Sequence, residues 1–279
     1  MDMKKALAEI LLFVPGTRLD LAEKAYACGA DAPVIDWEDT VADGDKARVR
    51  RETAGYAAGN GCKPVWIRIN SEKSPFFADD LACLPDIANL AGVLLPKTES
   101  AAAVCRTAKA AGGRPVVAMI ESAAAWLGAA EIAKAEGLSA LTYGCLDLLA
   151  ELSCTRNSEA GRMMLNRLRG DLLLAGTANG LYPPLEGIFP ELKNDAAYRE
   201  YLQFGRDLGF SGALCLHPQQ VAVARSLNEN RARLQFAARV LAEYQRSGAE
   251  VFQLDGQMID KPVIEEAKRL LQGGENSLI

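Results

Sequence analysis

The stretch Val116-Val117-Ala118-Met119-Ile120-Glu121-Ser122 decides how the fold is organised. Its apolar residues end abruptly in a carboxylate, with Gly113 and Pro115 before them and an alanine-rich segment of helical character after them. An apolar run of this length between chain breakers is typical of a strand that is buried on both faces. Because a glutamate is costly inside such a strand, we expect Glu121 at its carboxyl end, facing a cleft.

An apolar run followed by a helical segment recurs along most of the chain. Predicted strands cover residues 10–14, 33–39, 64–70, 92–97, 116–122, 140–143, 182–189 and 212–216, and predicted helices cover 20–28, 45–58, 78–89, 99–111, 123–136, 162–177 and 198–208. The seventh strand is the weakest, because Pro183 and Pro184 interrupt it. Eight repeats in 279 residues predict a (β/α)8 TIM barrel of the α/β class. An open doubly wound sheet is disfavoured, because residues 15–17 (PGT) do not form its glycine-rich turn.

The alternation stops after His217. Residues 228–247 predict a long helix, 254–260 a turn and 262–272 a last helix. We therefore divide the chain into a barrel catalytic domain at 1–227 and a C-terminal helical extension at 228–279. The extension is expected to complete an active site, either its own or that of a neighbouring subunit.

The composition is that of an ordinary globular protein, with 31 Lys and Arg against 36 Asp and Glu and a net charge of −5. This acidic balance argues against nucleic acid as the main partner. The seven cysteines form no CxxC pair, which is typical of reduced thiols in a cytosolic protein. The N-terminus lacks a secretory signal and no apolar run could span a bilayer. We expect a cytoplasmic protein without a membrane partner.

Charged residues stand at or just after nearly every predicted strand, where a barrel carries its active site. They are Glu38, Asp39, Arg68, Lys97, Glu121, Asp147 and, after the weak seventh strand, Glu186. Glu121 and Asp147 follow neighbouring strands and offer the oxygen ligands that Mg²⁺ prefers. The alternative for this part of the chain is helix N-capping by Asp147 and Ser122.

Arg68 lies between apolar residues and must be paired if buried. Its planar guanidinium suits a substrate carboxylate or carbonyl oxygen, and the alternative is a structural ion pair with Glu38 or Asp39. Lys97 is either a partner of the metal carboxylates or a solvent-exposed lysine. His217, the only histidine, is more simply a strand-end residue bonded to nearby backbone than a catalytic base. No serine stands on a nucleophile elbow and no lysine lies inside a strand, which favours metal-dependent chemistry.

A set of short motifs runs in order along almost the whole chain. They are residues 12–16 (LFVPG), 36–41 (DWEDTV), 46–48 (KAR), 68–70 (RIN), 95–100 (LPKTES), 120–122 (IES), 144–147 (GCLD), 216–219 (LHPQ) and 255–262 (DGQMIDKP). Together they resemble the HpcH/HpaI aldolase and citrate lyase beta-subunit family, and within it the stand-alone acyl-CoA lyase branch. The chain departs from the family at Trp37, where an aliphatic residue is usual, and around the seventh strand.

The resemblance implies Mg²⁺ held by Glu121 and Asp147, and a thioester carried on coenzyme A or an acyl carrier. It implies that Arg68 binds the oxo-acid half of the substrate. In several relatives the aspartate matching Asp260 reaches a neighbour's site and moves the proton at the thioester's α-carbon. The resemblance thus implies a homo-oligomer, a trimer or a hexamer.

The remaining site residues implied by the resemblance surround Arg68. Glu38 is expected to be catalytic and, with Asp39, to bond the metal's waters and Arg68. Pro15, Gly16, Asp39 and Lys97 are expected on the substrate-binding side.

The expected activity is carbon–carbon cleavage of a 3-hydroxy-dicarboxyl-CoA thioester. The best candidate is (S)-citramalyl-CoA, giving acetyl-CoA and pyruvate, or malyl-CoA, giving acetyl-CoA and glyoxylate. Two alternatives stay open: a citrate lyase beta subunit acting on a citryl-acyl-carrier thioester, and a non-catalytic protein that binds a CoA ester.

Overall fold

The computed structural model describes residues 7–228 and 231–275. The chain divides into two compact units, Leu7–Arg225 and the segment from Ser226 onward.

Eight parallel strands form the centre of the first unit. They are β1 (Ile10–Pro15), β2 (Ala32–Asp36), β3 (Val65–Arg68), β4 (Leu90–Leu95), β5 (Val116–Ile120), β6 (Leu138–Tyr143), β7 (Leu185–Glu186) and β8 (Gly212–Cys215), in the order β6-β5-β4-β3-β2-β1-β8-β7. Two hydrogen bonds join the end strands of this order: the Tyr182 N–H donates to the Ser139 carbonyl and the Thr142 hydroxyl to the Leu185 carbonyl, both at 2.9 Å. The predicted (β/α)8 barrel is confirmed.

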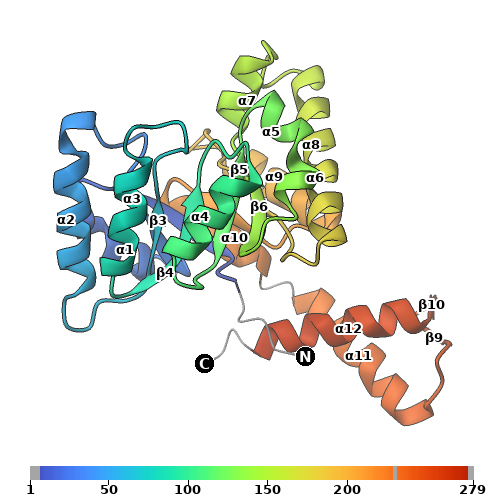
Figure 1. Cartoon of the computed structure of the whole chain (residues 1–279). Helices are drawn as coiled ribbons and strands as arrows, with labels where there is room; N and C mark the ends of the chain where they lie inside the picture. Colours follow the sequence, from blue (N-terminus) through green and yellow to red (C-terminus); the bar gives the residue numbers. More distant parts are fainter. Residues whose placement is uncertain (1–6, 229–230, 276–279) are drawn as a thin grey trace. The chain divides into compact units, whose positions relative to one another are not determined.

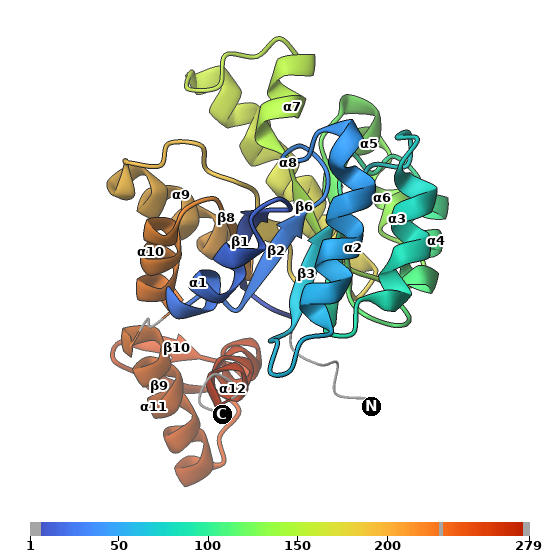
Figure 2. The same cartoon turned by 90° about the vertical axis from the view of Figure 1, so that its left-hand side faces the viewer.

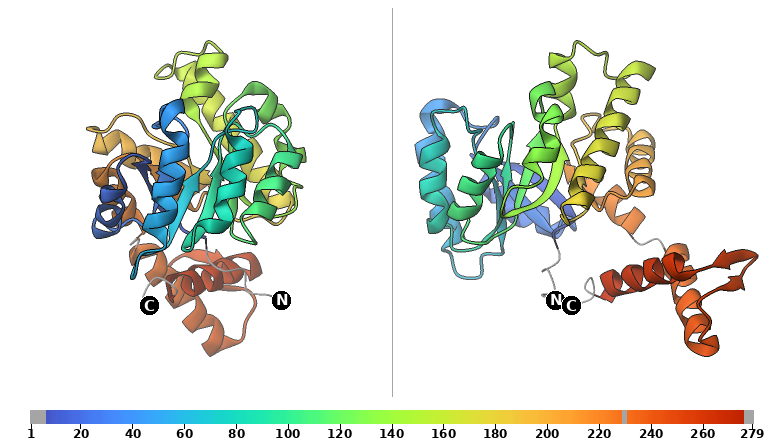
Figure 3. Two further views of the ribbon diagram at one scale, coloured as in Figure 1. Left: turned by 60° about the vertical axis from the view of Figure 1, so that its left-hand side comes forward. Right: turned by 45° about the vertical axis from the view of Figure 1, so that its right-hand side comes forward.

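Helices surround the strands (Figures 1 and 3). They are α1 (Ala22–Ala27), α2 (Lys46–Ala57), α3 (Phe77–Cys83), α4 (Ala101–Ala110), α5 (Ala123–Leu127), α6 (Ala129–Ile132), α7 (Cys145–Glu151), α8 (Glu159–Ala178), α9 (Asp195–Leu208) and α10 (Pro218–Asn228). Three short 3-10 turns add to them: η1 (Leu19–Leu21), η2 (Asp43–Asp45) and η3 (Leu84–Asp86). Figure 2 shows α2 lying across the outside of β2 and β3.

Four elements of the first unit differ from the sequence-based expectation. The seventh strand is limited to Leu185–Glu186, because Pro183 and Pro184 have no N–H to donate to a ladder. The predicted helix at 123–136 is two short helices, α5 and α6, that meet at Gly128. Helices α7 and α10 were not expected from the sequence.

The barrel interior is filled by apolar side chains from all eight strands. The central cluster contains Leu11, Val34, Trp66, Leu94, Val117, Met119, Ala140, Leu185 and Leu214, all buried. Trp66 is the largest member and reaches across to β4. A Cβ atom at Gly92 would stand 2.5 Å from the Trp66 ring. Only glycine therefore fits opposite this indole.

The second unit is a helical hairpin with a small antiparallel ribbon. It contains α11 (Arg231–Ser247), β9 (Phe252–Leu254), β10 (Gln257–Ile259) and α12 (Lys261–Glu275). Asp255 and Gly256 form the turn of the ribbon with positive φ of 50° and 80°, the conformation of a tight two-residue hairpin. The predicted turn at 254–260 thus includes a strand pair. Ala237, Val240 and Ile264 form part of its buried apolar cluster.

Within the described residues, no helix combines the length and apolarity that crossing a membrane requires. The seven cysteines all lie in the described part and none of them is in a disulfide.

The contact between Gly92 and Trp66 predicts a specific cost for a small substitution. Gly92→Ala should lower the free energy of unfolding by about 1–3 kcal/mol, because the added methyl overpacks the indole. Gly55→Ala is the matched control: Gly55 lies in α2 with nothing within 4 Å of its added Cβ, so the change should stabilise the helix by up to about 1 kcal/mol. Urea unfolding measures both, and equal effects would contradict the packing described here.

Candidate functional site

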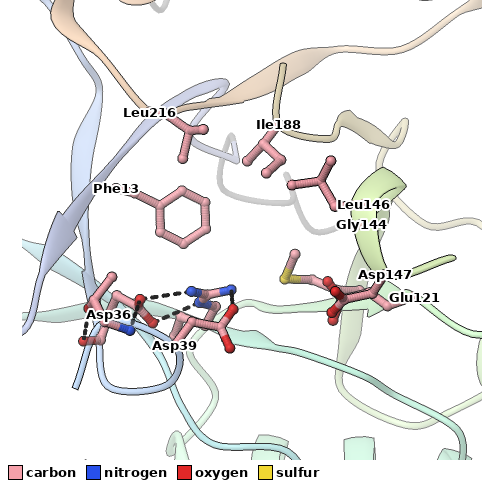
Figure 4. A pocket seen from close by; sticks show the side chains of 12 residues that line it. Phe13, Asp36, Asp39, Glu121, Gly144, Leu146, Asp147, Ile188 and Leu216 are labelled. Carbon is pink, nitrogen blue, oxygen red and sulfur yellow. Dashed lines mark hydrogen bonds and ion pairs between the residues drawn. The ribbon is translucent and has the colours of Figure 1, made fainter. Parts of the chain in front are cut away.

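A cavity of about 230 Å³ opens at the carboxyl ends of the strands. It is lined by Phe13, Asp36, Asp39, Thr40, Arg68, Met119, Glu121, Gly144, Leu146, Asp147, Ile188 and Leu216. Figure 4 shows Glu121 and Asp147 beside one another, Asp36 and Asp39 across the cavity from them, and the apolar Phe13, Leu216 and Ile188 along another side. The cavity therefore has a charged wall and an apolar wall.

Glu121 stands directly after β5 and is buried, with 7 % of its surface exposed. Its Oε2 accepts a 2.6 Å hydrogen bond from the Lys97 backbone N–H, and Lys97 adopts a positive φ of 47°. On the other side, a Cβ atom at Gly144 would lie 2.1 Å from Oε1. The Glu121 carboxylate thus occupies the space that a side chain at position 144 would fill.

Burial raises the pKa of Glu121 to about 7, and the neighbouring carboxylates Glu38 and Asp147 add to the rise, while the Lys97 N–H opposes it. A carboxylate in this position is held close to like charges at a cost in free energy. A cation bound there would relieve that repulsion.

Asp147 lies in the first turn of α7, which begins at the end of β6. In Figure 1, β5 and β6 lie side by side with α5 and α7 beyond their ends. The N-cap of α7 is Gly144, without a side-chain cap, so the capping alternative is wrong for Asp147. It is confirmed for Ser122, whose hydroxyl accepts the Ala125 N–H at 3.1 Å.

Arg68 ends β3 and pairs most closely with Asp36, the residue opposite it at the end of β2. Its Nε and Nη2 each donate to one oxygen of Asp36 at 2.7 Å. Its Nη1 lies 3.0 Å from Glu38 Oε2 and 3.2 Å from Asp39 Oδ2. The predicted ion pair of Arg68 with Glu38 or Asp39 is therefore present with both residues. The main partner, Asp36, was not predicted. The signal was present, because Asp36 and Arg68 are the last residues of two neighbouring parallel strands.

The Asp36–Arg68 pair is strong because it is buried and bidentate. Burial alone would raise the pKa of Asp36, but the hydrogen bonds and charge of Arg68 outweigh it and hold that pKa below its ordinary value. The three carboxylates around Arg68 raise the pKa of its guanidinium despite the opposing effect of burial. Arg68 also lies over the ring of Phe13, 4.8 Å from its centroid.

Lys97 extends its ammonium between the two groups of carboxylates. Its Nζ lies 2.5 Å from Glu38 Oε1, 3.5 Å from Asp39 Oδ1 and 3.8 Å from Asp147 Oδ2. Lys97 is thus a partner of these carboxylates and not a lone solvent-exposed lysine. The other oxygen of Glu38, Oε2, is buried without a hydrogen-bond partner in the described part of the chain; its contact with Arg68 is close but poorly aligned.

The mouth of the barrel fits a hard divalent cation. Five carboxylates (Asp36, Glu38, Asp39, Glu121, Asp147) face two cationic side chains, Arg68 and Lys97. The described residues contain no group of three or more acidic, histidine or cysteine side chains placed to hold a metal. Mg²⁺ typically takes one or two protein carboxylates and completes its shell with water and substrate. Glu121 and Asp147, which lie beside one another in Figure 4, supply that number of carboxylates.

Other predicted site residues lie apart from the cavity lining. Pro15 ends β1 and Gly16 follows it, and a Cβ at Gly16 would stand 2.5 Å from the Asp36 carbonyl. His217 accepts the Gln219 N–H at 3.1 Å through Nδ1, as expected for a strand-end residue. Asp260 belongs to the second unit, where its Oδ1 accepts the Val263 N–H at 3.3 Å.

The expectation that Glu186 faces the mouth is wrong. Its carboxylate contacts Arg169 of α8, 2.9 Å away, and lies against Gly205 of α9. Glu186 precedes Gly187 at the end of β7 and turns outward between strand and helices, because side chains alternate along a strand.

The sequence of this chain matches the HpcH/HpaI aldolase/citrate lyase family over residues 9–218. The chain belongs to this family. It is 31 % identical over 285 residues to the citrate lyase subunit beta-like protein of Deinococcus radiodurans, covering 97 % of this chain and 99 % of the relative. It is 32 % identical over 275 residues to a (3S)-malyl-CoA thioesterase of Cereibacter sphaeroides, covering 95 % and 94 %.

Solved structures of the family share the fold. Protein CitE from Mycobacterium tuberculosis, in complex with magnesium, acetoacetate and coenzyme A, superposes with a TM-score of 0.80 at 31 % identity, covering 95 % of this chain and 97 % of that one. The family assignment places this chain among lyases.

The lowered pKa of Asp36 predicts a pH-dependent contribution to stability. Its carboxylate stabilises the fold fully above the unfolded-state pKa of about 3.9 and loses that effect as the pH falls through the lower folded-state value. Asp36→Asn should therefore cost about 3–5 kcal/mol near pH 7 and less near pH 3, below the unfolded-state pKa.

Asp39→Asn is the matched control, because Asp39 pairs with the same guanidinium but is exposed; we expect a cost below about 1 kcal/mol. Urea unfolding at both pH values measures these differences. A cost of Asp36→Asn that does not change with pH would contradict the assigned pair.

Proposed function

We propose that this protein is a Mg²⁺-dependent lyase that cleaves a 3-hydroxy-dicarboxyl-CoA thioester, with (S)-citramalyl-CoA or malyl-CoA as substrate. The observation that carries the proposal is the excess of carboxylates over cations at the barrel mouth. An anionic dicarboxyl substrate would be repelled there unless a divalent cation were bound. Magnesium in the CitE complexes of the family supports the same conclusion.

Glu121 and Asp147 are the proposed ligands of the ion. When bound there, Mg²⁺ supplies Lewis acidity, which lowers the pKa of an attached hydroxyl and stabilises negative charge on oxygen. Glu38 and Asp39 hold Arg68 and Lys97 in place through their ion pairs.

The reaction breaks the bond between the carbinol carbon and the carbon next to the thioester. The hydroxyl loses its proton to a carboxylate of the site and becomes the carbonyl of the oxo-acid, while the electron pair of the broken bond passes to the thioester as an enolate. Arg68, fixed by Asp36, presents positive charge to the oxo-acid half without reorganising. A carboxylic acid must then deliver a proton to the enolate carbon to give acetyl-CoA.

The apolar wall favours a small oxo-acid. Leu146 and Ile188 line this side with Phe13 and Leu216, and none of these side chains can pair with a further carboxylate. The methyl group of pyruvate or the hydrogen of glyoxylate fits such a wall, whereas the second carboxylate of oxaloacetate would be desolvated there without a partner. This argument places citramalyl-CoA and malyl-CoA ahead of a citryl thioester.

Asp260 is the proposed acid for the enolate. It lies in the second unit, within a motif that resembles the family's. The resemblance implies that the matching aspartate of several relatives acts in an active site. We propose that Asp260 serves the site of a neighbouring subunit in a homo-oligomer.

The decisive experiment is to incubate the purified protein with citramalyl-CoA, malyl-CoA and citryl-CoA, with Mg²⁺ or with a chelator. We expect acetyl-CoA and pyruvate, or acetyl-CoA and glyoxylate, only when Mg²⁺ is present. Glu121→Gln should lower kcat/KM by about a hundredfold or more. Glu131→Gln, on the exposed surface of α6, is the control and should leave the activity unchanged.

The same assay separates the competing activities. Carbon–carbon cleavage yields acetyl-CoA, whereas a thioesterase yields free CoA thiol, and the malyl-CoA thioesterases among the relatives make that measurement necessary. Turnover of citryl-CoA alone would favour the citrate lyase subunit. Binding of a CoA ester without turnover of any substrate, unaffected by Glu121→Gln, would overturn the lyase proposal.

The role of Asp260 has its own test. Asp260→Asn should lower kcat by about a hundredfold or more while metal binding persists, because the acid is lost but the ligands remain. Mixing this variant with Glu121→Gln after mild dissociation should restore part of the activity if Asp260 acts in a neighbour's site. Full activity of Asp260→Asn alone would contradict the assignment.

A further inference from the structure

The barrel closes differently between β6 and β7 than elsewhere. The other neighbouring strands are joined by parallel ladders, whereas none is formed between these two in the described chain. The Tyr182 N–H bonds the Ser139 carbonyl near the start of β6, and the Thr142 hydroxyl bonds the Leu185 carbonyl. At the carboxyl end of this seam, β6 and β7 are joined by side-chain contacts.

A buried polar network lies behind that end of the seam. Tyr143, the last residue of β6, donates its hydroxyl to Glu186 Oε2 at 2.5 Å and stands 2.7 Å from the Tyr201 hydroxyl of α9. Arg169 of α8 donates to the Tyr143 hydroxyl and to Glu186 Oε2, both at 2.9 Å. The Tyr201 hydroxyl also donates to the Gly187 carbonyl at 3.2 Å. Four elements, β6, β7, α8 and α9, thus share one cluster.

The network is costly to bury and specific in shape. Glu186 is 1 % exposed and its Oε1 has no hydrogen-bond partner in the described chain. A Cβ at Gly205 would stand 1.9 Å from that oxygen, so neither a larger residue nor a ligand fits. Burial raises the pKa of Glu186 although Arg169 and Tyr143 oppose the rise. The attraction within a buried charge cluster often fails to offset the free energy lost by removing its charges from water.

The network is continuous with the cavity through two short segments. Tyr143 is followed by Gly144 and the turn of α7 that carries Asp147. Glu186 is followed by Gly187, whose added Cβ would meet the Tyr143 carbonyl at 2.3 Å, and then by Ile188 in the cavity wall. The Cys145 thiol donates to the Ile188 carbonyl at 3.5 Å and joins the two segments.

We propose that the network of Tyr143, Arg169, Glu186 and Tyr201 is a positioning device that fixes Asp147 relative to Glu121 and thereby sets the affinity of the site for its divalent cation. The inference rests on the proposed metal ligands, because it concerns the geometry in which Asp147 meets them. The ladder to β5, which pairs Tyr143 with Ile120, holds the β6 end on one side. On the β7 side, where no ladder forms in the described chain, the side-chain network is what supports this end and the α7 turn that follows it.

The test compares two tyrosine-to-phenylalanine variants. Tyr143→Phe removes the hydroxyl at the centre of the network. Tyr198→Phe removes an equally buried hydroxyl on α9, whose partner is the thiol of Cys215 at 3.4 Å on β8. Binding of Mn²⁺ is measured by electron paramagnetic resonance and of Mg²⁺ by calorimetry, with urea unfolding alongside.

We expect Tyr143→Phe to weaken Mn²⁺ and Mg²⁺ binding by about tenfold, as loss of a supporting contact to a metal ligand does. Tyr198→Phe should leave the Kd unchanged at a similar loss of stability. Saturating Mg²⁺ should restore the kcat of Tyr143→Phe, a rescue that a merely structural defect would not show. Glu186→Gln, which keeps the shape but removes the charge, should weaken binding in the same direction.

An unchanged Kd in Tyr143→Phe and Glu186→Gln would overturn the positioning role while leaving the proposed function standing. Equal weakening in Tyr198→Phe would overturn it as well, by showing that any buried hydroxyl has this effect. Metal binding that survives Glu121→Gln undiminished would instead overturn the proposed ligands themselves. The three failures are distinguishable within one set of titrations.

Discussion

The structure depends on holding like charges together at one end of a barrel. Glu121 and Asp147 on one side and Asp36, Glu38 and Asp39 on the other lie around two cationic side chains. Such a cluster is unfavourable by itself and persists only because the surrounding fold fixes it. The repulsion among these carboxylates favours binding, because a divalent cation, together with an anionic substrate, can lower the electrostatic energy of the cluster.

Rigid contacts on both sides keep the cluster in place. The guanidinium of Arg68 holds Asp36 with two hydrogen bonds, and the backbone of Lys97 donates to Glu121. Glycine at position 144 leaves the room that the Glu121 carboxylate occupies. These contacts belong to strands β2 to β5, which have laddered neighbours on both sides. Asp147 follows β6, which is laddered to β5 but not to β7 in the described chain.

The seam between β6 and β7 explains why a costly cluster is retained behind the barrel wall. Two prolines prevent the segment before β7 from donating backbone hydrogen bonds, so the seam needs other contacts. Arg169 and the Tyr143 hydroxyl converge on one oxygen of Glu186, and the Tyr201 hydroxyl contacts that of Tyr143, so that two helices are tied to two strand ends. Low-dielectric surroundings make each of these bonds strong when paired. The two prolines that shorten the seventh strand thus account for the polar network beside it.

Sequence reasoning found the barrel and most of the charged residues at its mouth, because strand ends and apolar runs are local properties. It missed Asp36 as the main partner of Arg68, since pairing across two strands depends on their register. It placed Glu186 at the mouth, whereas the side chain turns outward, because direction depends on which face of a two-residue strand is inward. The helix carrying Asp147 also went unpredicted, being only Cys145–Glu151.

The sequence by itself determined the eightfold alternation of strands and helices and the charged residues at the strand ends. Both follow from the spacing of apolar residues and from residue type, which are local properties of the chain. Only the tertiary structure decided which carboxylate meets which cation, how far apart they stand, and which side chains close the barrel. Those distances arise when strands that lie tens of residues apart in the chain are brought into register and closed into one barrel, and no local pattern contains that information.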